Sequence, residues 1–175
     1  MEAYEAILTR RSIRKYTDEP VSSELCEKII KAGMYAPSAH NSQPWHFIAV
    51  TERETLDKLS EHGKYYTMLL EAQLCVIVCA EMALVEGNNP VRFSQDCAAA
   101  TQNILLAAHD AGLGGVWLGV YPSESQMSGV SSVVELPSDG SIVPVSMISL
   151  GWPAQQRRQP DRFKPERIHY GKWRA

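Results

Sequence analysis

Two amide side chains stand between prolines in the loop with the most specific chemistry in this sequence. The loop consists of Pro37-Ser38-Ala39-His40-Asn41-Ser42-Gln43-Pro44-Trp45. Each proline forbids a continuous helix and favours extended geometry in the residue before it. Asn41 and Gln43 each carry a donor pair and an acceptor, which match the alternating N–H and C=O groups of a flat heterocycle. The loop therefore predicts a heterocycle site, and the alternative from composition alone is a polar turn after a helix.

A second segment whose residues could bind a ligand lies near the start of the chain, and it is basic. Arg10, Arg11, Arg14 and Lys15 crowd into six positions, with Ser12 among them. Guanidinium groups hold phosphate oxygens in a planar fork, and a serine hydroxyl adds one hydrogen bond. The segment fits either a phosphate site or a solvated basic patch. An RNA-binding patch is the weakest interpretation, because the net charge is −3 and no aromatic platform accompanies the cations.

The order of residues in these two segments resembles one protein family. Pro-Ser-x-x-Asn-x-Gln-Pro-Trp resembles the flavin loop of the nitroreductase family, the FMN-dependent NAD(P)H oxidoreductases. Arg-Arg-Ser-x-Arg stands where that family carries its FMN phosphate and ribityl contacts. Two motifs in the right order are much harder to obtain by chance than one. The resemblance extends from Arg10 to Trp173.

The resemblance implies which residues hold the phosphate end of FMN. Arg10, Ser12, Arg162 and Lys164 would bind phosphate and ribityl oxygens. The pair of cations at residues 162 and 164 also fits a solvated tail when it is considered alone.

The resemblance also implies contacts to the flavin ring. Asn41 and Gln43 would contact the ring or the ribityl chain, and Arg14 would lie near its N1–C2 end. A backbone N–H of Leu118 or Gly119 would meet flavin N5, since glycine permits close approach of the backbone. The complete set of expected FMN-binding residues is Arg10, Arg11, Ser12, Arg14, Pro37, Ser38, Asn41, Gln43, Leu118, Gly119, Arg162 and Lys164.

The elements that position these residues follow from apolar spacing. Helices are predicted over residues 1–9, 24–35, 52–62, 94–109 and 123–134, with a short helical segment at 65–70 and a loop at 86–90. Strands are predicted over residues 46–51, 74–80, 113–122 and 142–150. We therefore expect an α+β, nitroreductase-like fold. A central, mostly antiparallel sheet flanked by helices would form a single FMN-binding domain over residues 1–175.

The helix at 94–109 indicates how the chain assembles. From Ala98 to Ala108 it carries small and apolar residues on most faces, and such a helix is buried. In a chain of 175 residues this favours a subunit interface. Members of the resembling family are homodimers in which both chains touch the flavin, so we expect a homodimer.

Composition limits the other classes of protein. The chain is 45% hydrophobic and 21% charged, which suits a compact domain with its own core. No apolar run reaches the roughly 20 residues that span a bilayer, and no signal core is present, so we expect a cytoplasmic protein. The four cysteines form no Cys-x-x-Cys pair and have no histidine at metal spacing. We expect free thiols and no metal.

The resemblance implies an oxidoreductase that passes electrons from NAD(P)H through flavin to a nitroaromatic, a quinone or a similar acceptor. The flavin would do the chemistry, so no catalytic acid–base pair is expected, and Arg14 would stabilise the reduced flavin. No Gly-x-Gly-x-x-Gly follows a strand and opens a helix, so no separate dinucleotide domain is expected. The two substrates would then use one flavin face in turn, in a ping-pong mechanism.

Two alternatives share the same motifs. One is a non-catalytic module that binds or stores FMN. The other is a flavin enzyme of the same fold with different chemistry, such as dehalogenation or flavin fragmentation. The choice between NADH and NADPH stays open.

Overall fold

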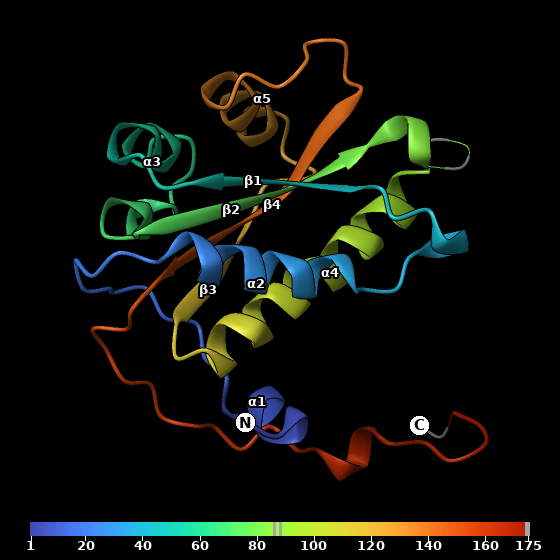
Figure 1. The fold of residues 1–175 in the computed structure, drawn as a ribbon. Helices are drawn as coiled ribbons and strands as arrows, with labels where there is room; N and C mark the ends of the chain where they lie inside the picture. Colours follow the sequence, from blue (N-terminus) through green and yellow to red (C-terminus); the bar gives the residue numbers. More distant parts are fainter. Residues whose placement is uncertain (86, 88, 174–175) are drawn as a thin grey trace.

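A four-stranded sheet forms the centre of the computed structural model, which describes residues 1–85, 87 and 89–173 (Figure 1). All three pairs of neighbouring strands are antiparallel. The α+β fold and the antiparallel sheet are therefore confirmed. The strand order is β1 (Trp45–Val50), β2 (Leu74–Glu81), β4 (Ile142–Gly151), β3 (Gly114–Gly119).

The two central strands, β2 and β4, are buried on both faces. Every side chain from Leu74 to Ala80 is buried, as expected for a continuous apolar run in mid-sheet. Successive residues of a strand point to opposite faces. Accordingly, Leu74 and Val76 belong to one hydrophobic cluster, whereas Cys75 and Ile77 belong to another. The sheet thus separates two cores.

Helices cover both faces of the sheet. In Figure 1, α2 and α4 lie below it, and α3 and α5 lie above it. Ile29 of α2 and Ile104 of α4 join the cluster on the first face. Leu59 of α3 and Val130 of α5 join the cluster on the second. The helices are α1 (Ala3–Thr9), α2 (Ser23–Met34), α3 (Arg53–Ser60), α4 (Pro90–Asp110) and α5 (Glu124–Val133), with short 3-10 turns at Ala39–Asn41, Thr67–Leu70, Met82–Leu84 and Pro165–Arg167.

The predicted helices occur, and one boundary was wrong. Ser22 caps α2 by accepting the Leu25 N–H at 3.2 Å. However, α4 begins at Pro90, four residues before its predicted start at residue 94. Proline suits the first helical turn, and the Asn89 side chain accepts the Val91 N–H at 3.0 Å. Positions 86 and 88 of the predicted loop lie outside the described residues.

Much of the apolar surface of α4 is covered within one chain. Cys97, Ala100 and Ile104 pack into the core between the sheet and α2, and the Asn103 amide donates to the Ala32 carbonyl at 3.1 Å. The remaining face is half-buried rather than open. The apolar character of α4 therefore reflects intrachain packing first.

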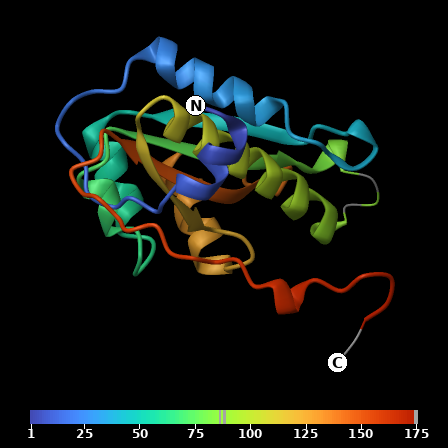
Figure 2. The same ribbon diagram turned by 90° about the horizontal axis from the view of Figure 1, so that it is seen from below.

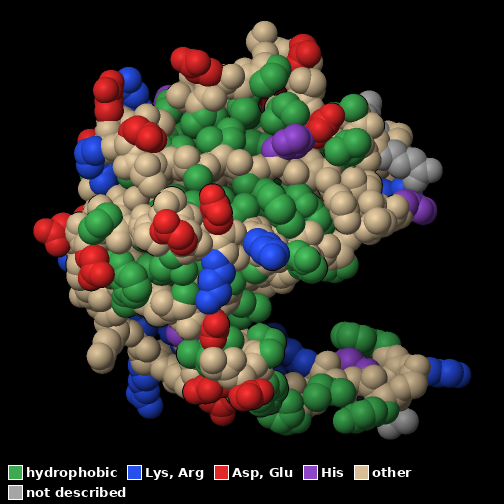
Figure 3. All heavy atoms as spheres, in the orientation of Figure 1, with side chains coloured by type: hydrophobic (Ala, Val, Ile, Leu, Met, Phe, Trp, Pro, Cys, Tyr) green, Lys and Arg blue, Asp and Glu red, His purple; other side chains and the backbone are tan. Residues whose placement is uncertain are grey.

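After β4 the chain stays against the body as far as Arg157, which lines a cavity there, and residues 158–173 then form an extended arm (Figure 2). Figure 3 shows an open space between this arm and the body. Large apolar side chains are exposed on it: Phe163, Ile168, Tyr170 and Trp173, the last with 80% of its surface accessible.

The cysteines lie inside the protein as free thiols. Burial raises the pKa of Cys75, Cys79 and Cys97 to about 12, and it also raises the pKa of Cys26. Within the described residues, no group of histidine, cysteine, aspartate and glutamate side chains is arranged to hold a metal ion. In the same part of the chain, none of the helices combines the length and hydropathy that crossing a bilayer requires.

Candidate active site

The basic segment runs along the edge of the sheet beside β3. Ser12 forms a parallel bridge with Gly115, and the Ile13 N–H donates to the Gly115 carbonyl at 3.0 Å. The buried Tyr16 hydroxyl lies 2.7 Å from the Ile13 carbonyl oxygen, to which it donates, and accepts from the Ser149 hydroxyl at 3.0 Å. Burial raises the pKa of Tyr16 far above its ordinary value, so the hydroxyl stays a donor. The sheet thereby fixes the backbone that carries the arginines.

Guanidinium groups converge at the end of α1. Burial lowers the pKa of the half-buried Arg10, and the like charges of Arg162 and Arg11 lower it further. Arg11 donates through Nη2 to the Leu8 carbonyl at 2.7 Å and through Nη1 to the Arg10 carbonyl. Arg11 therefore caps α1, while Arg10 carries a charge whose nearest charged neighbours repel it. Such a concentration of positive charge favours an anion.

A cavity of about 450 Å³ adjoins these groups, between α1, the end of α4 and the start of β3. Among the described residues, two buried side-chain nitrogens have no hydrogen-bond partner, Arg11 Nε and Gln155 Nε2. Both residues line this cavity. A buried donor without a partner costs about 1–3 kcal/mol, so both groups would gain from a ligand with acceptor oxygens.

The Pro37–Trp45 loop has an unusual backbone. His40, Asn41 and Gln43 have φ angles of 54°, 56° and 47°, in the left-handed region that residues other than glycine rarely adopt. Strain of this kind costs on the order of 1–3 kcal/mol per residue and clusters at functional sites. The loop therefore needs specific bonds to hold its shape.

Those bonds come largely from the loop itself. The Ser38 hydroxyl accepts the Gln43 N–H at 3.0 Å, and the Gln43 side-chain Nε2 donates to Asn41 Oδ1 at 3.0 Å. Both amide side chains are exposed. Their mutual bond engages one donor and one acceptor, which leaves the Asn41 amino group and the Gln43 oxygen to meet a ligand.

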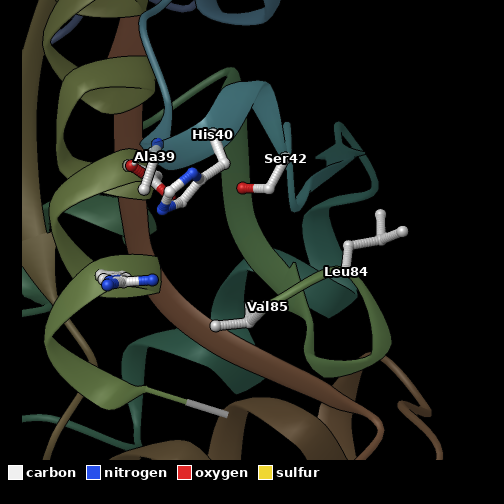
Figure 4. A pocket seen from close by; sticks show the side chains of 7 residues that line it. Ala39, His40, Ser42, Leu84 and Val85 are labelled. Atoms are coloured by element: carbon white, nitrogen blue, oxygen red, sulfur yellow. Dashed lines mark hydrogen bonds between the residues drawn. The ribbon is translucent and has the colours of Figure 1, made fainter. Parts of the chain in front are cut away.

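One anchor comes from outside the loop. Asp96 on α4 is only 7% exposed, and its Oδ1 accepts the Ala39 N–H at 3.0 Å. The two residues line a cavity of about 270 Å³ into which the labelled side chains His40 and Val85 also face (Figure 4). Asp96 thereby ties the loop to the helix beneath the sheet.

A further cavity, of about 470 Å³, opens at the end of β3. Arg14, Leu118 and Gly119 all line it, as do two neighbouring tyrosines. Tyr65 is 73% exposed, whereas Tyr66 is 2% exposed and its hydroxyl donates to the Gly119 carbonyl. A Cβ atom built on Gly119 would meet no atom within 4 Å, so the backbone is open to a ligand there.

Within one chain, these predicted residues form two separate groups. Those at Arg10–Arg14, at Leu118–Gly119 and at Arg162 gather around β3, whereas the Pro37–Trp45 loop leads into β1. β1 and β3 are opposite edges of the sheet, about 14 Å apart at roughly 4.8 Å per strand. Lys164 lies exposed on the arm, where its carbonyl accepts the Arg167 N–H at 3.0 Å.

Three residues of these sites were missed by sequence reasoning. Asp96 was expected as part of the helix at 94–109 and Tyr66 as part of the short helical segment at 65–70, whereas no role was expected for Gln155. The signal available for Asp96 was a carboxylate next to the run of small and apolar residues that begins at Cys97, since a buried charge needs a partner. Gln155 gave no comparable signal.

Comparison with known proteins agrees with the motifs. The model of the nitroreductase family matches residues 7–64 and 60–152. A protein of Methanothermobacter thermautotrophicus, provisionally named NADH dehydrogenase/NAD(P)H nitroreductase, is 47% identical over 99% of this chain and 88% of its own length. This chain therefore belongs to the nitroreductase family.

Solved structures give the same result. A protein of Parabacteroides distasonis with the same provisional name is 38% identical, with a TM-score of 0.90 over 98% of both chains. An FMN-dependent nitroreductase of Clostridium difficile is 27% identical, with a TM-score of 0.87 over 97% of this chain and 99% of that one.

Proposed function

We propose that this chain transfers electrons from NAD(P)H to a nitroaromatic, a quinone or a similar acceptor by a ping-pong mechanism. The protein is an NAD(P)H-dependent oxidoreductase and its cofactor is FMN. The observation that carries the proposal is the cavity beside Arg10, where guanidinium groups converge and two buried donors lack partners. A phosphate fits this set of groups, because it offers negative charge and several acceptor oxygens.

At the phosphate end, Arg10 and Ser12 bind the phosphate and ribityl oxygens, together with Arg162 and Lys164 from the arm. Gln155 supplies one more donor through its unpaired Nε2. Arg11 holds the end of α1 with two of its nitrogens, and its Nε is the nitrogen left without a partner.

At the ring end, the loop from Pro37 to Gln43 approaches from a second copy of the chain. The separation of the loop from the basic segment across the sheet supports this arrangement. Ser38 holds the loop, and Asn41 and Gln43 contact the ring or ribityl chain with the amide groups left over from their mutual bond. Leu118 and Gly119 present the backbone at the end of β3.

The exposed apolar surface also supports a homodimer. Tyr4, Ile7 and Leu8 of α1 are exposed, and so are Phe163 and Trp173 of the arm. The arm and α1 would gain packing against a second copy, in an interface on the order of 2,000 Å². Sedimentation of the FMN-loaded protein as a monomer at micromolar concentration would refute the dimer.

The chemistry divides between cofactor and protein. When bound, FMN supplies a ring that accepts a hydride from NAD(P)H and passes electrons to an acceptor. Arg14 supplies positive charge at the cavity, where negative charge develops on reduction. We further propose that residues 1–175 form a single FMN-binding domain in which the two substrates occupy one open face in turn.

The experiment that tests this function starts from the visible spectrum of the purified protein with added FMN. We expect tight binding, and anaerobic NADH or NADPH should bleach the flavin spectrum. Steady-state rates should give parallel lines in double-reciprocal plots, because the substrates share one site. Protein that binds no FMN would refute the proposal, bound FMN that no nicotinamide bleaches would favour a storage module, and intersecting lines would exclude the shared site.

A further inference from the structure

A buried tyrosine, Tyr66, lines the cavity at the end of β3 and lies outside the two sequence motifs. Tyr66 lies just before the 3-10 turn Thr67–Leu70, and its ring belongs to the hydrophobic cluster on the second face of the sheet. Its hydroxyl leaves that cluster and donates to the Gly119 carbonyl, at the last residue of β3. The ring also lines the cavity that Arg14 and Gly119 share.

Gly119 needs such a bond. Beyond it, the N–H groups of Val120 and Tyr121 both donate to the Val145 carbonyl, at 3.2 and 3.0 Å, so the regular ladder ends here. Glycine at a strand end has a freer ψ angle than other residues. The Val120 N–H bond holds one side of the peptide plane that follows Gly119, and the hydrogen bond to the Gly119 carbonyl holds the other side.

The tyrosine is itself held rigidly. A Cβ atom built on Gly63 would lie 2.7 Å from Cδ2 and Cε2 of the Tyr66 ring, so chain and ring are in close contact there. Burial raises the pKa of Tyr66 to about 12, and the hydroxyl therefore remains a donor at physiological pH. The Tyr66 ring is thus held in a fixed position between the hydrophobic cluster on the second face of the sheet and the cavity.

We propose that Tyr66 is a positioning residue, whose hydroxyl sets the orientation of the Gly119 backbone against the bound flavin. The inference rests on the proposed function, because it assumes that FMN occupies the cavity at the end of β3. It assigns to Tyr66 no contact with the cofactor and no proton transfer.

The principal test is Tyr66→Phe, which keeps the buried ring and removes one hydroxyl. We expect FMN affinity to fall about 3- to 10-fold, the effect of losing one hydrogen bond. Hydrogen exchange at the Val120 amide of the apoprotein should speed up. The matched control is Tyr121→Phe. The Tyr121 ring packs against Phe93 on the other face of the sheet, with ring centroids 5.0 Å apart. The FMN affinity of this variant should match that of the wild type.

Two further variants keep the inference testable. Gly63→Ala should displace the Tyr66 ring and weaken FMN binding in the same direction as Tyr66→Phe. Gly119→Ala adds a methyl group where the chain itself has open space, so the fold should survive while FMN binding is lost. Wild-type affinity in Gly119→Ala would show that the flavin does not approach this residue and would overturn the inference.

The outcomes distinguish a failure of the proposed function from a failure of the inference about Tyr66. A wild-type protein that binds no FMN refutes the proposed function. A wild-type protein that binds FMN, with unchanged affinity in Tyr66→Phe, refutes only the role of Tyr66. Equal losses of affinity in Tyr66→Phe and Tyr121→Phe, with equal falls in the melting temperature of the apoprotein, would also refute it, because both would reflect general destabilisation.

Discussion

The Arg10–Arg14 segment and the Pro37–Trp45 loop reach their functional shapes by different means. The first is extended and pairs with β3, and the Tyr16 hydroxyl holds the Ile13 carbonyl from within the core. The second has left-handed residues at three positions and depends on side-chain bonds from Ser38, Asn41 and Asp96. Backbone pairing tolerates substitutions of side chains, whereas a loop held by side chains does not.

This difference predicts where single substitutions act. In the basic segment, a change of side chain should remove that side chain's own contact and little else. In the loop, a change at an anchor should alter the position of several groups at once. The variants below are ordered from the largest expected effect to the smallest.

The largest effect is expected from Arg10→Ala. A charge-assisted hydrogen bond contributes about 1.5–3 kcal/mol, so FMN affinity should fall by roughly 10- to 150-fold. The melting temperature of the apoprotein should stay constant or rise, because the substitution relieves repulsion from Arg162 and Arg11. Fluorescence titration with FMN and thermal melting measure the two quantities.

Lys15→Ala is the matched control, since it removes the same charge from the same segment. Its side chain is exposed, and its carbonyl keeps the bond from the Ala154 N–H at 2.9 Å. Affinity should change little. Similar losses in both variants would mean that net charge alone attracts FMN, and no phosphate site at Arg10 would then be needed.

The second effect tests the loop through Asp96→Ala. This change removes the acceptor for the Ala39 N–H, and a partly buried donor left without a partner costs about 1–3 kcal/mol. Both the free energy of unfolding and FMN affinity should fall, because the loop loses its tie to α4. Urea unfolding of the apoprotein and fluorescence titration are the measurements.

Asp96→Asn separates the hydrogen bond from the charge. The asparagine oxygen can accept the same N–H, so we expect this variant to recover most of the affinity that Asp96→Ala loses. If Asp96→Asn were as weak as Asp96→Ala, the negative charge would be the essential feature. The interpretation of Asp96 as a loop anchor would then fail.

The fold could be predicted from the sequence because its signals are local. The apolar run from Leu74 to Ala80 and the β-forming segment at 142–150 predict buried central strands, which is what the structure contains. The start of α4 was misplaced because Asn89-Pro90 was interpreted as loop, although asparagine followed by proline is also a helix start. Sequence periodicity does not distinguish intrachain from interchain packing, so the intrachain part of the burial of α4 became apparent only in the structure.

The site was only partly accessible from sequence for a physical reason. Arg10, Asn41 and Gln43 stood out because they belong to motifs that can be recognised along the sequence. Side chains that hold the motifs are remote in sequence: Asp96 acts on Ala39, and Tyr66 acts on Gly119. Only the folded chain brings such pairs together, and no spacing rule predicts them.

The smallest effect concerns the pH dependence of stability, and it links the basic segment to α4. His109, at the end of α4, lies 2.8 Å from the Thr9 hydroxyl through Nε2. Burial lowers its pKa below the ordinary value of 6.5, and the charges of Arg10 and Arg11 lower it further against weaker opposition from Asp110 and Glu5. Below pH 6.5 the unfolded chain therefore takes up a proton that the folded chain resists.

Stability of the apoprotein should consequently fall as the pH drops below 6.5, and His109→Gln should reduce that slope. Bound FMN sharpens the test, because its phosphate beside Arg10 and Arg11 would offset their repulsion of a protonated His109. The slope should then be shallower with saturating FMN than without it, and Arg10→Ala should make the apoprotein slope shallower too. Urea unfolding across this pH range provides the measurement. A slope that is the same with and without FMN would place the phosphate away from these arginines and would remove the electrostatic argument for the basic segment.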